Sequence, residues 1–184
     1  MSATNRGSKR IKSDFYKTPQ KTIEILLKNH KIKGTHILEP CAGDGSIIKP
    51  LRQYYNNLHI TAIETRTEEE KKLNIISDNV IIDDFLNFYP QNNFDTIITN
   101  PPYSIAQEIL EHCFKISNKN TEIIVLLRLA FLESKKRFNF WQKYIVNKLY
   151  VLSERPSFTG KGTDATAYGW FVFNNSQTQH IKII

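Results

Sequence analysis

Short runs rich in isoleucine and valine recur between residues 36 and 127, and segments with helical character separate them. The runs are residues 36–39, 60–64, 80–82, 96–99 and 122–127. Their nearly continuous apolar character is typical of strands that are buried on both faces of a sheet. Helices are expected near residues 46–55, 68–73, 104–116 and 133–144. This alternation predicts an α/β fold with a doubly wound, mostly parallel sheet and right-handed crossovers.

The last third of the chain changes pattern, because two apolar runs flank a loop that contains glycine. Residues 149–152 and 169–173 are expected to pair as an antiparallel hairpin across the loop at 156–168. Residues 180–184 are a candidate edge strand. The complete prediction is a Rossmann-like, seven-stranded, mostly parallel sheet with an antiparallel C-terminal hairpin.

A chain of 184 residues is long enough for one domain with a sizeable core and too short for two of full size. We expect a flexible basic arm at residues 1–13 and a single globular domain at residues 14–184. Near the start of that domain, Thr18 and Pro19 predict the N-cap and the first position of a helix with apolar residues at 23–27.

The composition favours nucleic acid as a partner and gives no sign of a membrane. Its 25 Lys and Arg residues exceed its 18 Asp and Glu residues, and a net charge of +7 favours a polyanion. Cys41 and Cys113 are too few for a disulfide framework and lie outside the closely spaced Cys/His sets that bind zinc. No stretch approaches the roughly 20 apolar residues of a membrane span. We expect a soluble, intracellular, cytoplasmic protein without a metal site.

In an open α/β sheet a ligand binds at the carboxyl ends of the strands, so the residues that follow each predicted strand are candidates for a site. The first strand is followed by EPCAGDG, residues 39–45, where two glycines let the backbone approach a ligand closely. The second strand ends at Glu64, which can accept hydrogen bonds from ribose hydroxyl groups. Asp84 and Phe85 follow the third and suit an adenine ring. No P-loop sequence follows any strand, which argues against a triphosphate ligand.

Asn100, Pro101, Pro102 and Tyr103 follow the fourth strand and form the most specific sequence in the chain. An amino group on an aromatic ring or a carbonyl is a poor nucleophile, because its lone pair is delocalised. The Asn100 side-chain oxygen and the Pro101 carbonyl can bind its N–H groups and return electron density to the nitrogen. Tyr103 is expected to stack on the base, while alignment and fixed dipoles supply the rate. These residues are the candidate catalytic loop.

These motifs resemble those of the amino-methyltransferases, particularly the DNA adenine-N6 methyltransferases with Asn-Pro-Pro-Tyr, over most of the chain. The resemblance implies a class I methyltransferase fold, S-adenosylmethionine as cofactor, S-adenosylhomocysteine as product, and methyl transfer to N6 of adenine in DNA. The family's N-terminal cofactor motif corresponds to residues 14–19, whose Tyr16, Thr18 and Pro19 would line the methionine end. The other implied cofactor contacts are Glu39, Pro40, Ala42, Gly43, Gly45, Glu64, Asp84, Phe85 and Asn100.

Three later segments resemble small phage-type or virus-type members of this family. They are residues 128–134, 155–158 and 168–173. In the family an aromatic side chain near the last hairpin helps to hold the flipped target base, a role that Phe158, Trp170 or Phe171 would take here.

The chain departs from the larger DNA-modifying members, because we expect no separate target-recognition domain. Recognition of the nucleic acid would then depend on the loop at 153–168, on the helix at 133–144 or on a partner. The candidate phosphate contacts are Lys135, Lys136, Arg137, Arg155 and Lys161.

Three alternatives stay open at this point. RNA adenine or guanine amino-methyltransferases use the same core chemistry. Protein glutamine methyltransferases share Asn-Pro-Pro-Tyr but carry an N-terminal helical domain, for which the residues before the first strand are too few. An inactive nucleic-acid-binding subunit would be expected to lose acceptors or glycines, whereas Asn100, Gly43, Gly45 and Glu64 are all present.

Overall fold

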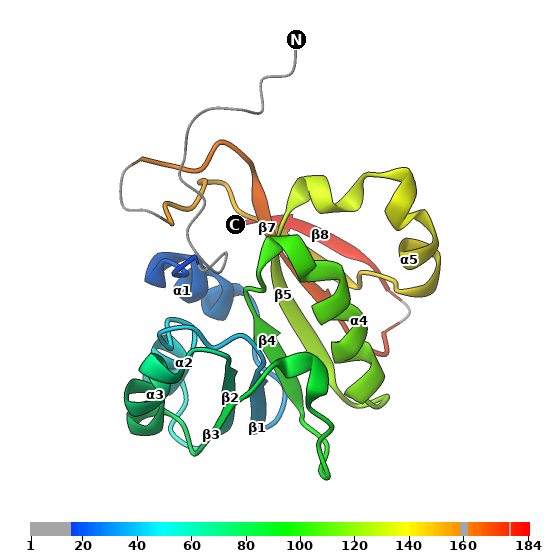
Figure 1. Ribbon diagram of the computed structural model, residues 1–184. Helices are drawn as coiled ribbons and strands as arrows, with labels where there is room; N and C mark the ends of the chain where they lie inside the picture. Colours follow the sequence, from blue (N-terminus) through cyan, green and yellow to red (C-terminus); the bar gives the residue numbers. More distant parts are fainter. Residues whose placement is uncertain (1–15, 159–161, 177) are drawn as a thin grey trace.

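Figure 1 shows the computed structural model, which describes residues 16–158, 162–176 and 178–184. Within these residues eight strands form one sheet in the order β3-β2-β1-β4-β5-β7-β6-β8. They are β1 His36–Glu39, β2 His59–Glu64, β3 Asn79–Ile82, β4 Thr96–Thr99, β5 Glu122–Arg128, β6 Lys148–Val151, β7 Tyr168–Phe173 and β8 His180–Ile183. The first five strands are parallel, β7 is antiparallel to β5 and β6, and β8 is parallel to β6. The predicted mostly parallel sheet with an antiparallel hairpin is therefore confirmed.

Helices cover both faces of the sheet (Figure 1). They are α1 Gln20–Asn29, α2 Ile48–Tyr54, α3 Glu70–Ile76, α4 Ala106–Ile116 and α5 Phe138–Lys143. Successive strand residues point to opposite faces, so the core divides into two apolar clusters. One cluster, which includes Ile37, joins the sheet to α1, α2 and α3, and the other, which includes Leu38, joins it to α4 and α5. The arrangement is a sheet between two helical layers.

The number of strands and the start of one helix differ from the prediction. His180–Ile183 pairs with β6, so the described residues hold eight strands rather than seven. The helix expected near residue 104 begins at Ala106, because Tyr103–Ile105 form a turn of 3₁₀ helix first. The helix expected at 133–144 is shorter, because Ser134 has a φ of 113° that a helix cannot contain.

The predicted cap of the first helix is also displaced by one residue. Pro19 rather than Thr18 is the N-cap of α1, and it gives the helix no side-chain cap. The Thr18 hydroxyl accepts a hydrogen bond from the Asn100 side chain instead. Thr18 thus binds the side chain that follows β4 and does not cap α1.

Some expectations lie outside the described residues: the basic arm at 1–13, the first two residues of the motif at 14–19, and Lys161. None of the helices in the described part of the chain is long and apolar enough to span a membrane.

A buried polar group ties the end of α1 to β5 and β6. Nε2 of His30 lies 2.9 Å from Oε2 of Glu122, and Nδ1 lies 3.1 Å from the Tyr150 hydroxyl oxygen. The His30 and Glu122 side chains are 3% and 6% exposed. Asn174 donates to the other Glu122 oxygen at 3.3 Å. Each buried polar atom of this pair therefore has a partner, as buried charge requires.

Candidate functional site

A cavity of about 420 Å³ lies at the carboxyl ends of the parallel strands, a volume typical of small-molecule sites. Neighbouring strands β1 and β4 mark the topological switch point of the sheet, where α/β folds bind ligands. The predicted residues that line it are Tyr16, Thr18, Glu39, Pro40, Ala42, Gly43, Glu64, Asp84, Phe85, Asn100, Pro101 and Pro102. The glycine-rich loop and the Asn-Pro-Pro segment thus share one cavity.

The loop after β1 takes a backbone conformation that its glycines allow. Gly43 and Gly45 have φ angles of 58° and 74°, in the left-handed region that glycine adopts without strain. The Gly43 N–H donates to Oε2 of Glu64 at 2.7 Å and so joins the ends of β1 and β2. Gly45 is not among the residues that line the cavity, and a Cβ there would lie 2.2 Å from Cδ1 of Ile76. Its role is the close packing of this loop against α3.

Glu64 is buried at the end of β2, as predicted, and it binds Arg66, which we did not predict as a partner. Its Oε1 accepts hydrogen bonds from the backbone N–H and from Nε of Arg66, both at 3.0 Å. Arg66 lines the cavity and also lies near Glu69, with 3.6 Å between Nη1 and Oε1. A ligand hydroxyl group would therefore share Oε1 of Glu64 with the Arg66 guanidinium or displace it.

Glu39 presents an unpaired acceptor in the cavity wall. Its side chain is buried, and Oε2 has no hydrogen-bond partner among the described residues. Burial, and then the nearby carboxylates of Asp44 and Glu64, raise the pKa of Glu39 well above its usual value. Besides Glu39, the acidic residues Asp44, Glu64 and Asp84 line the cavity against one basic residue, Arg66, within the described part of the chain. This electrostatic balance favours a ligand that carries positive charge and disfavours a triphosphate.

Replacement of Glu39 by glutamine is expected to stabilise the ligand-free protein at pH 8 but not at pH 4. The pKa of Glu39 is higher in the folded protein than in the unfolded chain, so the native state holds a proton that the unfolded chain releases above about pH 4.5. The free energy of unfolding therefore falls as the pH rises toward the raised pKa, and the neutral amide removes this loss. We expect a gain of about 1–3 kcal/mol at pH 8 in urea unfolding.

The exposed Glu133 provides the control, because Glu133→Gln should change stability by less than about 0.5 kcal/mol at either pH. An equal effect of Glu39→Gln at pH 4 and pH 8 would show that the buried charge is not the cause.

Asn100 follows β4, and its side-chain amide is held in one orientation. Nδ2 donates to Oγ1 of Thr18 at 3.0 Å and to the backbone carbonyl of Tyr16 at 3.3 Å. A carbonyl oxygen can only accept, so the nitrogen of the amide has to face it. Oδ1 is buried and has no partner among the described residues. The amide oxygen is therefore an open acceptor in the cavity wall.

Tyr103 lies beside the cavity lining, within an aromatic cluster that comprises Tyr16, Tyr103, Phe158 and Tyr168. Its ring stacks on that of Tyr16, with 5.7 Å between the centroids and 23° between the planes. The rings of Phe158 and Tyr168 have centroids 6.4 and 5.8 Å from that of Tyr103. Burial raises the pKa of the Tyr103 hydroxyl, which therefore stays protonated.

Arg128, the last residue of β5, closes one side of this cluster. Its guanidinium carbon lies 4.6 Å from the centroid of the Tyr103 ring, within the range of a cation–π contact. Nε of Arg128 donates to the Tyr168 hydroxyl at 3.0 Å, and that hydroxyl donates to Oδ2 of Asp164 at 3.1 Å. Through Tyr103, the candidate catalytic loop thus contacts β5 and β7.

No protein-family model matches the chain. The type II methyltransferase M.CvrRI of Paramecium bursaria Chlorella virus XZ-6E is 25% identical, over 92% of this chain and 56% of its own length. A ribosomal RNA small subunit methyltransferase A of Mesoplasma florum is 31% identical, over 79% of this chain and 63% of its own length. The chain thus spans less than two thirds of the length of these relatives.

A solved structure gives a closer match in architecture. It is a protein of Listeria monocytogenes, described as a class I S-adenosylmethionine-dependent methyltransferase, and its TM-score is 0.70 over 95% of this chain and 67% of its own. The fold is that of the class I methyltransferases. At 13% identity the match concerns the fold, which the sequence analysis predicted correctly.

The expected base-holding role of two aromatic residues is wrong. Trp170 and Phe171 are both 0% exposed, because β7 is an interior strand of the class I methyltransferase fold and helices cover both of its faces. Nε1 of Trp170 donates to the Thr22 carbonyl at 3.0 Å. Phe158 is half-buried in the aromatic cluster and is the one candidate of the three beside Tyr103.

The predicted phosphate contacts within the described residues lie on the surface around this fold. Lys135, Lys136 and Arg155 are exposed. Arg137 is more constrained, because its guanidinium lies 4.3 Å from the Phe131 ring centroid and donates to the Glu133 carbonyl at 2.8 Å. Pro19, an expected cofactor contact, is the N-cap of α1 and is not among the residues that line the cavity.

Residues that we did not predict also line the cavity. They are Cys41, Asp44, Ser46, Thr65, Arg66, Ser104, Ile105 and Ile109. Most are neighbours of predicted residues in the loops at the strand ends. Ile105 and Ile109 come from the 3₁₀ turn after Pro102 and from the first part of α4, which follow the Asn-Pro-Pro segment directly.

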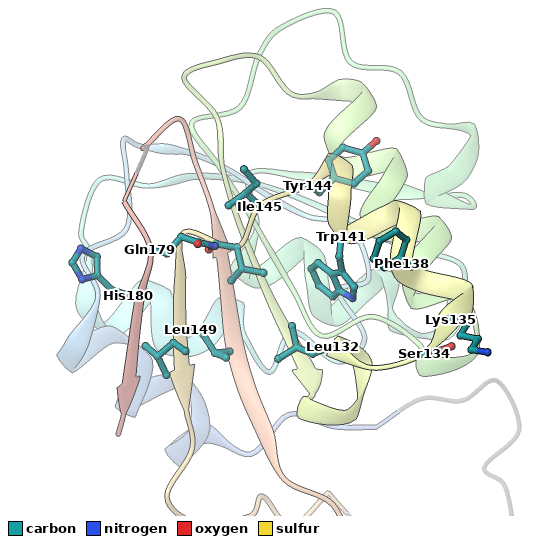
Figure 2. Close-up of a pocket in the computed structure, with 12 residues that line it drawn as sticks. Leu132, Ser134, Lys135, Phe138, Trp141, Tyr144, Ile145, Leu149, Gln179 and His180 are labelled. Carbon is teal, nitrogen blue, oxygen red and sulfur yellow. The ribbon is translucent and has the colours of Figure 1, made fainter.

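A second, larger cavity of about 870 Å³ lies between α5 and the β6–β8 edge of the class I methyltransferase fold (Figure 2). Apolar side chains such as Leu132, Trp141 and Leu149 form much of its lining. Its described lining includes neither the loop glycines nor the buried acids nor Asn100. The smaller cavity is therefore the candidate active site.

Proposed function

We propose that the chain transfers a methyl group from S-adenosylmethionine to the N6 amino group of adenine in DNA. The observation that carries the proposal is the Asn100 amide, whose oxygen is unpaired in the cavity wall while its nitrogen is bonded to Thr18 and Tyr16. An amino group is the substrate that such an acceptor suits, because it presents N–H donors and has a delocalised lone pair.

The cavity fits S-adenosylmethionine in charge and in residue types. The cofactor carries a positive sulfonium and a positive ammonium group, and Glu39, whose Oε2 has no partner among the described residues, would give up its proton beside such a cation. Glu64 would accept from ribose hydroxyl groups, and Asp84 and Phe85 would hold the adenine. When bound, the cofactor supplies an electrophilic methyl group. The similarity to methyltransferases in sequence and in fold supports this assignment.

The residues of the chain supply alignment and hydrogen-bond acceptors. Oδ1 of Asn100 and the carbonyl of Pro101 would each accept one N–H of the target amine, which directs its lone pair at the methyl carbon. The amine nitrogen would take the methyl group as S-adenosylhomocysteine leaves with the carbon–sulfur bonding electrons, and the methylated nitrogen would release a proton to water. No side chain of the chain has to act as a general base.

A nucleic-acid substrate is supported by the net charge of +7 and by the exposed Lys17 and Arg155, which lie close in sequence to Tyr16 and Phe158 of the aromatic cluster. DNA is the first choice because of the resemblance to the Asn-Pro-Pro-Tyr enzymes, and the type II methyltransferase matches 92% of the chain. RNA is the second candidate, because the relative with 31% identity is named as a ribosomal RNA methyltransferase.

The test is incubation of the protein with tritiated S-adenosylmethionine and, separately, DNA, RNA and a protein release factor. Nucleosides from the labelled polymer are then separated by chromatography. We expect the label in N6-methyl-2′-deoxyadenosine. Label only in a ribonucleoside would move the substrate to RNA, and label in protein or in no polymer would contradict the proposal.

A further inference from the structure

The orientation of the Asn100 side-chain amide decides whether it helps or hinders an amine substrate. The two ends of a carboxamide have nearly the same shape but opposite hydrogen-bonding character. With the oxygen toward the cavity, the amide accepts an N–H of the substrate. After a half-turn it would present its own N–H groups to those of the substrate, and the two sets of donors would repel. An enzyme that uses this amide therefore needs a means of holding it.

Two groups that precede α1 hold the amide nitrogen. The Tyr16 carbonyl accepts from Nδ2 at 3.3 Å, and the Thr18 hydroxyl accepts from the same atom at 3.0 Å. Thr18 is 4% exposed, so water does not readily replace its hydroxyl. Both contacts reach Asn100 from more than 80 residues earlier in the chain, at separations of 84 and 82.

The Thr18 hydroxyl forms the shorter of these contacts and is the one that a side-chain substitution can remove. No donor among the described residues holds the other end of the amide, because Oδ1 of Asn100 has no partner there. Without the hydroxyl, only the longer bond to the Tyr16 carbonyl would distinguish the two orientations.

We propose that Thr18 is a positioning residue that fixes the Asn100 amide with its oxygen toward the substrate amine. This inference rests on the proposed function, because it concerns the same reaction. It gives Thr18 a role different from the contact with the methionine end of the cofactor that the sequence resemblance implies.

The test compares Thr18→Val, which keeps the side-chain shape without the hydroxyl, with Thr18→Ser, which keeps the hydroxyl. Thr18→Val is expected to lower kcat about tenfold, the effect of one lost hydrogen bond on orientation. The Kd of S-adenosylhomocysteine by titration calorimetry and the KM for the nucleic acid should change less than about threefold. Thr18→Ser should restore most of kcat. Thr22→Val is the matched control, because Thr22 is also buried and its hydroxyl is not a described partner of Asn100.

A second measurement does not depend on turnover. The side-chain amide protons of Asn100, assigned by their loss in an Asn100→Ala spectrum, should exchange with solvent faster in Thr18→Val than in the unsubstituted protein. If kcat is unchanged in Thr18→Val, or if Kd for the cofactor product rises as much as kcat falls, the positioning role is overturned. Absence of methyl transfer by the unsubstituted protein would contradict the proposed function instead, and the exchange measurement would still test the amide contact.

Discussion

Asn100→Ala is expected to lower methyl transfer at least about 100-fold while cofactor binding survives. The substitution removes the open acceptor at the end of β4, and loss of one preorganised hydrogen-bonding group of this kind typically costs 10²- to 10³-fold in rate. The loss should appear in kcat, because the acceptor gains strength as the amine becomes positively charged. Tritium transfer to nucleic acid measures the rate, and calorimetry with S-adenosylhomocysteine measures binding, for which less than about a threefold change is expected.

Two further variants make the interpretation specific. Asn100→Asp keeps an acceptor but cannot donate to the Tyr16 carbonyl, so its activity should also fall well below that of the unsubstituted protein. Asn139→Ala changes an exposed residue of α5 and should leave both quantities unaltered. Transfer by Asn100→Ala at the unsubstituted rate would remove the amide from the mechanism.

His30→Ala is expected to lower the free energy of unfolding by about 3–5 kcal/mol, because it leaves the Glu122 carboxylate buried without its closest partner. The remaining side-chain hydrogen bond to Glu122, from Asn174, is longer at 3.3 Å. Urea unfolding followed by circular dichroism measures the change.

The exposed His36 provides the comparison. It lies 3.5 Å from Asp95, with side-chain exposures of 60% and 43%, and His36→Ala should cost less than about 1 kcal/mol. Combined replacement of the buried pair, His30→Leu with Glu122→Met, should cost less than His30→Ala alone, because no unpaired charge remains. A loss below about 1 kcal/mol in His30→Ala would show that Glu122 finds other partners.

The sequence predicted the fold and brought the candidate site residues to one cavity, because both depend on local patterns. Continuous apolar runs identify buried parallel strands, and the rule that ligands bind at the carboxyl ends of such strands then brings Glu39, Glu64 and Asn100 to one edge of the sheet. Gly43 could also be identified from the sequence, because the two glycines after the first strand indicate a tight loop beside a ligand. The structure gives Gly43 the positive φ that such a loop needs.

The errors arose where a residue's role depends on distant parts of the chain. Thr18 is a good helix cap by local rules, but Asn100, 82 residues later, takes its hydroxyl. Trp170 and Phe171 were expected near the target base from their place in the last hairpin, yet β8 and β6 extend the sheet beyond β7 and helices cover both faces. Likewise the contact of Arg66 with Glu64 follows from the turn after β2, whose shape the sequence does not reveal.

The contacts of the aromatic cluster have a consequence for how this protein could diversify. Phe158 and Tyr168 lie on either side of the segment at 159–167, yet both rings contact Tyr103 of the candidate catalytic loop, and Asp164 is linked through Tyr168 to Arg128. Substitutions at Phe158 or Tyr168 are therefore expected to shift Tyr103 as well. Under the proposed function, evolution or engineering of target preference at these two positions would alter turnover at the same time.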